Sequence, residues 1–114
     1  MNIGIDIIEI DRLDIDESGL KRLLSPRELK EFQKKFQNLS NHWRKKEFLA
    51  GKWACKEAII KAIGKSVPFN LLDIMWSQTK LICKYQNHTI YLSLSHNKTT
   101  CVAVAIENPT IKLP

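Results

Sequence analysis

Two carboxylates lie in apolar stretches of this 114-residue sequence. Asp6 falls within a run of isoleucines next to Gly4, and Glu57 falls among small and apolar residues. Removing a carboxylate from water is costly unless a cation pairs with it. Mg²⁺ commonly takes one or two protein carboxylates and completes its coordination with water and substrate phosphate. The pair therefore suits a divalent-cation site, while two simpler interpretations stay open: Asp6 at a solvated strand end, and Glu57 in an ion pair with Lys61.

Side chains that suit phosphate groups accompany this pair. Lys52, Lys56 and Lys61 fall in the same predicted helix as Glu57. Ser95 and His96 end a predicted strand at a turn, where a histidine is either solvated or, beside other polar groups, binds a phosphate. These residue types extend the metal hypothesis to a phosphorylated ligand.

The positioning elements begin with a strand. Alternation predicts it over 3–10, with isoleucines on one face and Asp6 on the other. Turn residues and β-branched runs predict four more strands in the second half of the chain, over 73–77, 80–85, 89–95 and 100–106. Short strands joined by turns indicate an antiparallel meander.

Two helices are predicted between the first strand and the meander. Ser25 begins a capping sequence that predicts a helix over about 26–37. A second helix is predicted over about 42–63, ending near Gly64. Its apolar residues occupy two nearly opposite sides, so we expect the sheet or a partner chain to cover much of its surface. The expected fold is α+β: a small antiparallel sheet wrapped around one long central helix.

Composition predicts one domain over 1–114 and an anionic partner. Residues 20–65 hold thirteen Lys and Arg against four Glu, whereas residues 1–19 hold six acids and one base. Such a basic segment favours nucleic acid, a phosphate ligand, a membrane surface or an acidic protein. The acidic N-terminus argues against export, and no apolar run reaches the length of a membrane span. Three cysteines without a pairing pattern are expected to be buried free thiols, as in the cytoplasm.

Three stretches together resemble one known family. GIDIIEIDRL near the N-terminus, FLAGKWACKEAIIKAIG in the long helix and LSLSHNKTTCVAVAIE near the end resemble holo-[acyl-carrier-protein] synthases, the small 4′-phosphopantetheinyl transferases. The three motifs occur in the family's order, and the resemblance extends over essentially the whole chain. There are two departures: Gly64-Lys65-Ser66 stands where the family commonly has Gly-Thr-Gly, and Pro26 stands near the position of a common Arg.

The resemblance implies an activity and a ligand set. The chain would transfer the 4′-phosphopantetheine group of coenzyme A to a serine of apo acyl carrier protein, releasing 3′,5′-ADP, in support of fatty acid and lipid biosynthesis. Asp6 and Glu57 would bind Mg²⁺, and Lys52 and Lys61 would contact the coenzyme A phosphates. Lys61 would also stabilise charge on the leaving phosphate, with Glu57 as the candidate base.

The resemblance also implies partners. Ser95 and His96 would lie near the nucleotide end of coenzyme A. The residues expected to contact the carrier protein are Arg12, Lys21, Arg22 and Arg27. The assembly would be a homotrimer with its sites between subunits.

Two alternatives remain beside this reading. A basic nucleic-acid-binding module would use the positive segment and two tryptophans, but these aromatics have core spacing and such a module leaves Asp6 unexplained. A catalytically inactive scaffold would require damage to the Asp6–Glu57 pair, and both residues are present. We therefore expect an enzyme that needs neither nucleic acid nor a membrane.

Overall fold

A single five-stranded sheet and the helices on one of its faces make up the fold. It is seen in a computed structural model that describes residues 2–37 and 42–107. All neighbouring strands are antiparallel, in the order β1-β5-β4-β3-β2. The strands are β1 (Asn2–Glu9), β2 (Ile74–Ser77), β3 (Lys80–Tyr85), β4 (His88–His96) and β5 (Thr100–Glu107). The expected α+β fold and the predicted strands are confirmed.

The helices of this layer are α1 (Glu17–Leu23), α2 (Pro26–Lys35) and α3 (His42–Ile63), with short 3₁₀ turns η1 (Ile10–Arg12) and η2 (Phe69–Leu71). The predicted cap of α2 is present: Ser25 Oγ accepts from the backbone N–H of Glu28, and the Glu28 carboxylate accepts from the N–H of Ser25. Gly64 follows α3 with φ of +75°, a conformation that favours glycine as a helix terminator. The sequence did not predict α1.

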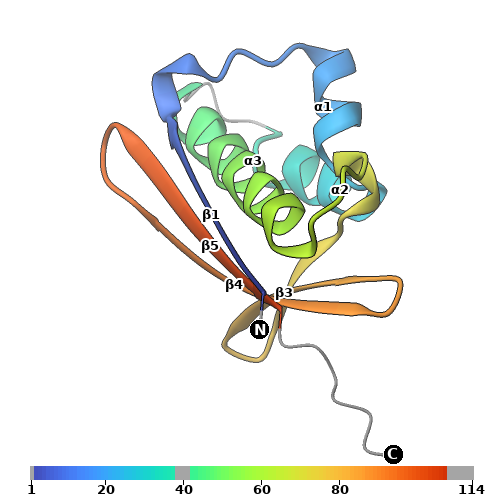
Figure 1. The fold of residues 1–114 in the computed structure, drawn as a ribbon. Coiled ribbons are helices and arrows are strands. Elements are labelled where there is room, and N and C mark those ends of the chain that lie inside the picture. The colour runs from blue at the N-terminus through green and yellow to red at the C-terminus, as the bar shows by residue number, and fades with distance from the viewer. Residues whose placement is uncertain (1, 38–41, 108–114) are drawn as a thin grey trace, which may run out of the picture.

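Helix α3 is central, lying between the sheet and the α1–α2 pair (Figure 1). On the sheet side it approaches β1 so closely that a Cβ on Gly4 would lie 1.9 Å from the carbonyl oxygen of Ala58. On the other side Trp53 packs edge-on against Phe69 of η2, with ring centroids 5.2 Å apart. Both apolar sides of α3 are thus covered within one chain, so the helix by itself does not require a partner subunit.

The opposite face of the sheet is uncovered, and along β1 and β5 it is apolar. Ile3, Ile5 and Ile7 are 61%, 57% and 68% exposed. The register places them beside Val102, Val104 and Ile106 on β5. The alternation predicted for the first strand is confirmed, but the isoleucine face is the open one, and Asp6 faces the helices. Among the described residues, no helix is long and apolar enough to cross a membrane.

Three cysteines complete the core. Cys55, Cys83 and Cys101 are buried free thiols, as the sequence predicted. Burial raises the pKa of Cys55 and of Cys83 to about 12. The thiolate forms needed for disulfide exchange or metal binding are therefore disfavoured.

Candidate active site

Asp6 and Lys61 meet where β1 crosses α3. The Lys61 ammonium donates to the carbonyl oxygen of Ile5 at 2.9 Å and lies 3.4 Å from Asp6 Oδ1. Asp6 is largely covered, with 17% of its side chain exposed, whereas Lys61 reaches solvent. Among the described residues, Lys61 forms no ion pair with Glu57, so that simpler interpretation of Glu57 does not hold.

Glu57 lies one helical turn before Lys61 and is half-buried. Its carboxylate has no hydrogen bond or ion pair to any residue in the described ranges 2–37 and 42–107. Positions four apart lie close together on a helix surface, so Glu57 lies between Trp53, which packs against η2, and Lys61, which reaches Asp6. These two carboxylates could supply oxygen ligands to a hard divalent cation. No cluster of three or more His, Cys, Asp or Glu that could hold a metal exists in the described part of the chain.

Lys52 and His96 line a different hollow, a cleft of about 300 Å³. The Lys52 ammonium lies 3.6 Å from Glu28 Oε2 and 5.2 Å from the centre of the Phe48 ring. His96 Nδ1 lies 3.6 Å from Glu47 Oε2. The cleft combines these cationic groups with apolar walls, which suits a ligand that is both anionic and partly apolar.

The two groups of residues lie on opposite sides of α3. Lys52 and Lys61 are nine residues apart, which corresponds to about 180° around a helix. Lys61 accordingly reaches Asp6 on β1, and Lys52 reaches Glu28 on α2. One chain therefore does not bring all the predicted phosphate-binding residues together.

Ser95 is separated from His96 as well. Strand neighbours point to opposite faces of a sheet. His96 pairs in register with buried Cys101 on the helix side, whereas Ser95 pairs with Val102 on the open face. The predicted Ser95–His96 pair is thus divided between the two faces of the sheet.

The residues predicted to contact a carrier protein lie along α1, α2 and η1. Arg12 is exposed and lies 3.7 Å from Glu9, and Lys21 and Arg22 occupy the last turn of α1. Arg22 also lines a hollow of about 390 Å³. Arg27 differs, because its guanidinium donates to Asp73, Glu31 and the carbonyl oxygen of Ile74. The hydrogen bond to Asp73 raises the pKa of Arg27.

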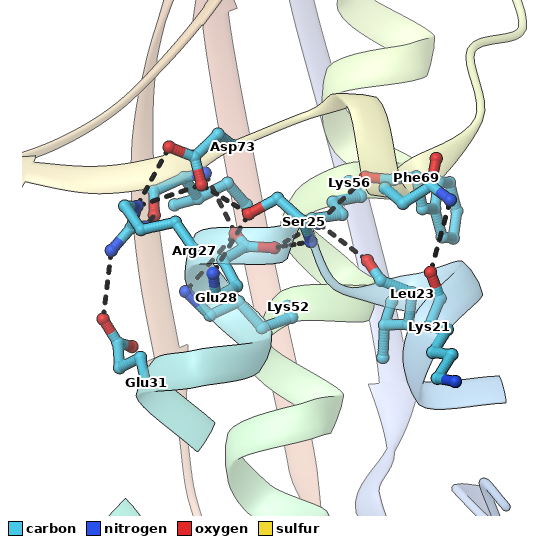
Figure 2. Close-up of polar contacts among 12 residues, drawn as sticks. Lys21, Leu23, Ser25, Arg27, Glu28, Glu31, Lys52, Lys56, Phe69 and Asp73 are labelled. Carbon is cyan, nitrogen blue, oxygen red and sulfur yellow. Dashed lines mark hydrogen bonds and ion pairs between the residues drawn. The ribbon is translucent and has the colours of Figure 1, made fainter. Parts of the chain in front are cut away.

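Lys56 is not placed to bind a substrate phosphate, contrary to the prediction. Its side chain is fully buried and its ammonium contacts three oxygens inside the protein (Figure 2). Burial lowers the pKa of Lys56, and the neighbouring Glu28 carboxylate opposes that shift. Sequence reasoning missed this interaction because it recognised Glu28 only as part of a helix cap.

Comparison with known proteins identifies the family. The family model described as the 4′-phosphopantetheinyl transferase superfamily matches residues 2–105. The chain belongs to this superfamily. Similar superfamily members include the holo-[acyl-carrier-protein] synthase of Mycoplasma capricolum subsp. capricolum, 39% identical over 107 residues and 93% of each chain. That of Staphylococcus aureus strain N315 is 39% identical over 101 residues, 84% of this chain and 85% of its own.

Solved structures of the superfamily share the fold. A holo-(acyl-carrier-protein) synthase from Bacillus anthracis, in complex with CoA (3′,5′-ADP), has a TM-score of 0.74 and 31% identity, covering 93% of this chain and 94% of that one. The holo-[acyl-carrier-protein] synthase from Neisseria meningitidis has a TM-score of 0.78 and 23% identity, covering 95% of this chain and 98% of that one. At this identity the likeness shows the fold alone. The family resemblance noted in the three sequence motifs is confirmed.

Proposed function

We propose that this chain transfers 4′-phosphopantetheine from coenzyme A to a serine hydroxyl of an apo acyl carrier protein. The observation that most directly supports this proposal is the contact between Lys61 and Asp6 where β1 crosses α3. Glu57 lies one helical turn before Lys61, and the chain belongs to this superfamily. The serine oxygen attacks the β-phosphorus of coenzyme A. The bond to the bridging oxygen breaks, and 3′,5′-ADP leaves.

Asp6 and Glu57 are proposed as the ligands of Mg²⁺. Asp6 is mostly covered and has Lys61 as its cationic neighbour, and Glu57 is half-buried without a partner in the described residues. Both offer the carboxylate oxygens that this ion prefers. When bound, Mg²⁺ supplies positive charge that neutralises and orients the pyrophosphate.

The other roles in the reaction are proposed for side chains of the protein itself. The Lys61 ammonium is exposed enough to reach the leaving phosphate and stabilise its charge. Glu57 is the candidate acceptor of the serine proton, because no residue in the described ranges pairs with its carboxylate. Lys52 is proposed to contact the coenzyme A phosphates, and Ser95 and His96 its nucleotide end.

A homotrimer with sites between subunits explains why these residues are divided. If the cleft of Lys52 and His96 on one copy faces Asp6, Glu57 and Lys61 of another, the two sides of α3 contribute to one site. The uncovered isoleucines of β1 supply an apolar face for such an assembly. Sedimentation tests this: the native chain should form trimers, and Ile5→Glu should yield smaller species. A fully active monomer would contradict it.

Carrier-protein binding is assigned to Arg12, Lys21, Arg22 and Arg27 on the basic helical surface. Acyl carrier proteins are acidic, so opposite charges would guide the encounter. We further propose that the chain acts in the cytoplasm, in fatty acid and lipid biosynthesis. It would do so as a single domain spanning residues 1–114. The alternative of nucleic-acid binding loses support because Trp53 packs against Phe69 and is not a free stacking surface.

The direct experiment is mass spectrometry of an apo acyl carrier protein incubated with this chain, coenzyme A and Mg²⁺. The proposal predicts that each carrier molecule gains one phosphopantetheine and that 3′,5′-ADP is released in equal amount. No gain with folded protein at high carrier-protein concentration would reject the activity.

A further inference from the structure

The Lys56 ammonium is the centre of a buried polar network (Figure 2). It donates to the carbonyl oxygen of Leu23 at 2.7 Å, to Glu28 Oε1 at 2.5 Å and to the carbonyl oxygen of Phe69 at 2.9 Å. An ammonium has three N–H donors, so every one has a partner. Because both Lys56 and Glu28 are fully buried, water cannot replace either partner.

Glu28 extends the network to further segments. Oε1 accepts from the N–H of Ser25 at 2.8 Å, and Oε2 accepts from the N–H of Ile74 at 2.9 Å. Lys52 lies 3.6 Å from the same carboxylate. One Glu–Lys pair therefore joins the start of α2, the start of β2 and the middle of α3.

The segments held in this way carry the proposed docking residues. Leu23 ends α1, directly after Lys21 and Arg22. Arg27 follows Ser25 in the first turn of α2. A hydrogen bond at the edge of the network also holds α1, since the Asn70 amide donates to the carbonyl oxygen of Lys21 at 3.2 Å. We call this bond the peripheral tether. On α3, Lys56 is the immediate neighbour of Glu57.

Stability alone does not account for such a pair. A buried ion pair recovers its desolvation cost only with good geometry, and well-packed apolar residues in its place are often equally stabilising. What apolar residues cannot do is fix two backbone carbonyls and two backbone N–H groups in defined directions. The Lys56–Glu28 pair does this for Leu23 and Ser25 at the α1–α2 junction, and it ties them to Phe69 of η2 and Ile74 of β2.

We propose that Lys56, together with Glu28, is a positioning residue that fixes the α1–α2 docking surface relative to Glu57 and Lys61. This rests on the proposed function, because it states how a serine of the bound carrier protein is aligned with the reacting phosphate. Misplacement by about 1 Å can cost up to about 100-fold in rate. The predicted defect is therefore in kcat and not in coenzyme A binding.

The test uses the double variant Lys56→Met/Glu28→Gln, which removes both charges and approximately keeps both volumes. We expect kcat for transfer to fall about tenfold or more, within the cost that misplacement can impose. The KM for coenzyme A and the affinity for 3′,5′-ADP, measured by calorimetry, should change less than about twofold. Arg22→Glu should show the opposite pattern, with a raised KM for the carrier protein and little change in kcat.

Ile90→Ala provides the control for lost stability. Ile90 is fully buried on β4 and has no part in the network. Its truncation should lower the melting temperature while kcat, measured well below that temperature, stays at the native value. An unchanged kcat in Lys56→Met/Glu28→Gln, or an equal fall in Ile90→Ala, overturns the proposal.

Two further measurements keep the test decisive. If the double variant does not fold, Asn70→Ala removes only the peripheral tether and should lower kcat about twofold to threefold without changing the KM for coenzyme A. If the native chain shows no transfer at all, the proposed function fails, and amide hydrogen exchange then decides the positioning role. Exchange over residues 17–24 should accelerate in the double variant and not in Ile90→Ala; unchanged exchange overturns it.

Discussion

The Lys61 ammonium lies 3.4 Å from the carboxylate of Asp6 and is held there by the carbonyl oxygen of Ile5. A lysine thus supplies positive charge beside the carboxylate proposed to bind Mg²⁺. The same ammonium is proposed to act on the leaving phosphate, so it has two competing anionic partners. Binding of a divalent cation to Asp6 would release Lys61 toward the substrate.

This relationship predicts opposite effects of Lys61→Ala on metal binding and on catalysis. Without the neighbouring ammonium, Mg²⁺ should bind the substrate-free protein about threefold to tenfold more tightly, because a like charge near the site is removed. The saturated transfer rate should nevertheless fall. Calorimetric titration with Mg²⁺ and steady-state kinetics measure the two effects. Lys65→Ala, just beyond α3, is the matched control and should change neither; weaker metal binding in Lys61→Ala would refute the competition.

The basic surface predicts a salt effect on carrier-protein encounter. Charge attraction mainly raises association rates and is screened over a Debye length of about 10 Å at 0.1 M salt. Transfer at subsaturating carrier protein should slow as NaCl rises, while the saturated rate changes much less. Arg12→Glu and Arg22→Glu should raise the KM for the carrier protein and leave the KM for coenzyme A unchanged. Lys65→Glu is the control, and native kinetics in both arginine variants at every salt concentration would remove them from the docking surface.

The division of residues across α3 predicts complementation between inactive variants. Asp6→Ala removes the carboxylate beside Lys61 on one side of α3, and Lys52→Ala removes the ammonium on the opposite side. If each site combines two copies, mixed oligomers contain some sites with both sides intact. Unfolding and refolding the two variants together should therefore restore part of the activity. Asp6→Ala mixed with Glu57→Ala, which damages the same side twice, should restore none; equal behaviour of the two mixtures would argue against shared sites.

Asp73 predicts a stability difference at acid pH. Burial opposes its ionisation, but hydrogen bonds from Arg27 and Ser25 outweigh that effect and lower the pKa of Asp73. A lowered native pKa gives a stabilisation that is complete above the unfolded pKa of about 3.9 and is lost as pH falls through the native value. Asp73→Asn should cost about 1–3 kcal/mol of unfolding free energy at pH 7.

Urea unfolding at several pH values measures this contribution. The gap in unfolding free energy between native chain and Asp73→Asn should be constant from pH 7 to pH 5 and should narrow below about pH 4. Glu17→Gln, on the exposed first turn of α1, serves as the control. A gap that stays constant down to pH 2 would contradict the assigned role of the Asp73 carboxylate.

Much of the fold could be predicted because its signals are local. The alternation of β1, the cap at Ser25 and the glycine after α3 each depend on a few neighbouring residues. Helix α1 escaped prediction because its seven residues are too few to establish a helical period, although Asp16 does cap it through the N–H of Gly19. Short helices are stabilised mainly by packing, which a single sequence does not display.

The site residues named from the sequence stay a prediction, but part of their spatial arrangement can be checked against the structure. The separation of Lys52 from Lys61 follows from helical geometry, and that of Ser95 from His96 follows from strand alternation; both signals were present in the sequence. The burial of Lys56 was not, because its partner Glu28 lies 28 residues away and meets it only through tertiary packing. A lysine beside a candidate metal ligand gives no local indication of such a contact.

The most direct test of the activity measures carrier-protein mass and 3′,5′-ADP release in one reaction, with the native chain and with Asp6→Ala and Glu57→Ala. The native chain should add one phosphopantetheine per carrier protein only when coenzyme A and Mg²⁺ are both present. A carrier protein lacking the acceptor serine should remain unmodified. Both variants should stay folded and lose Mg²⁺-dependent transfer. Absence of any mass gain with the native chain, or undiminished gain with both variants at limiting Mg²⁺, would contradict the account.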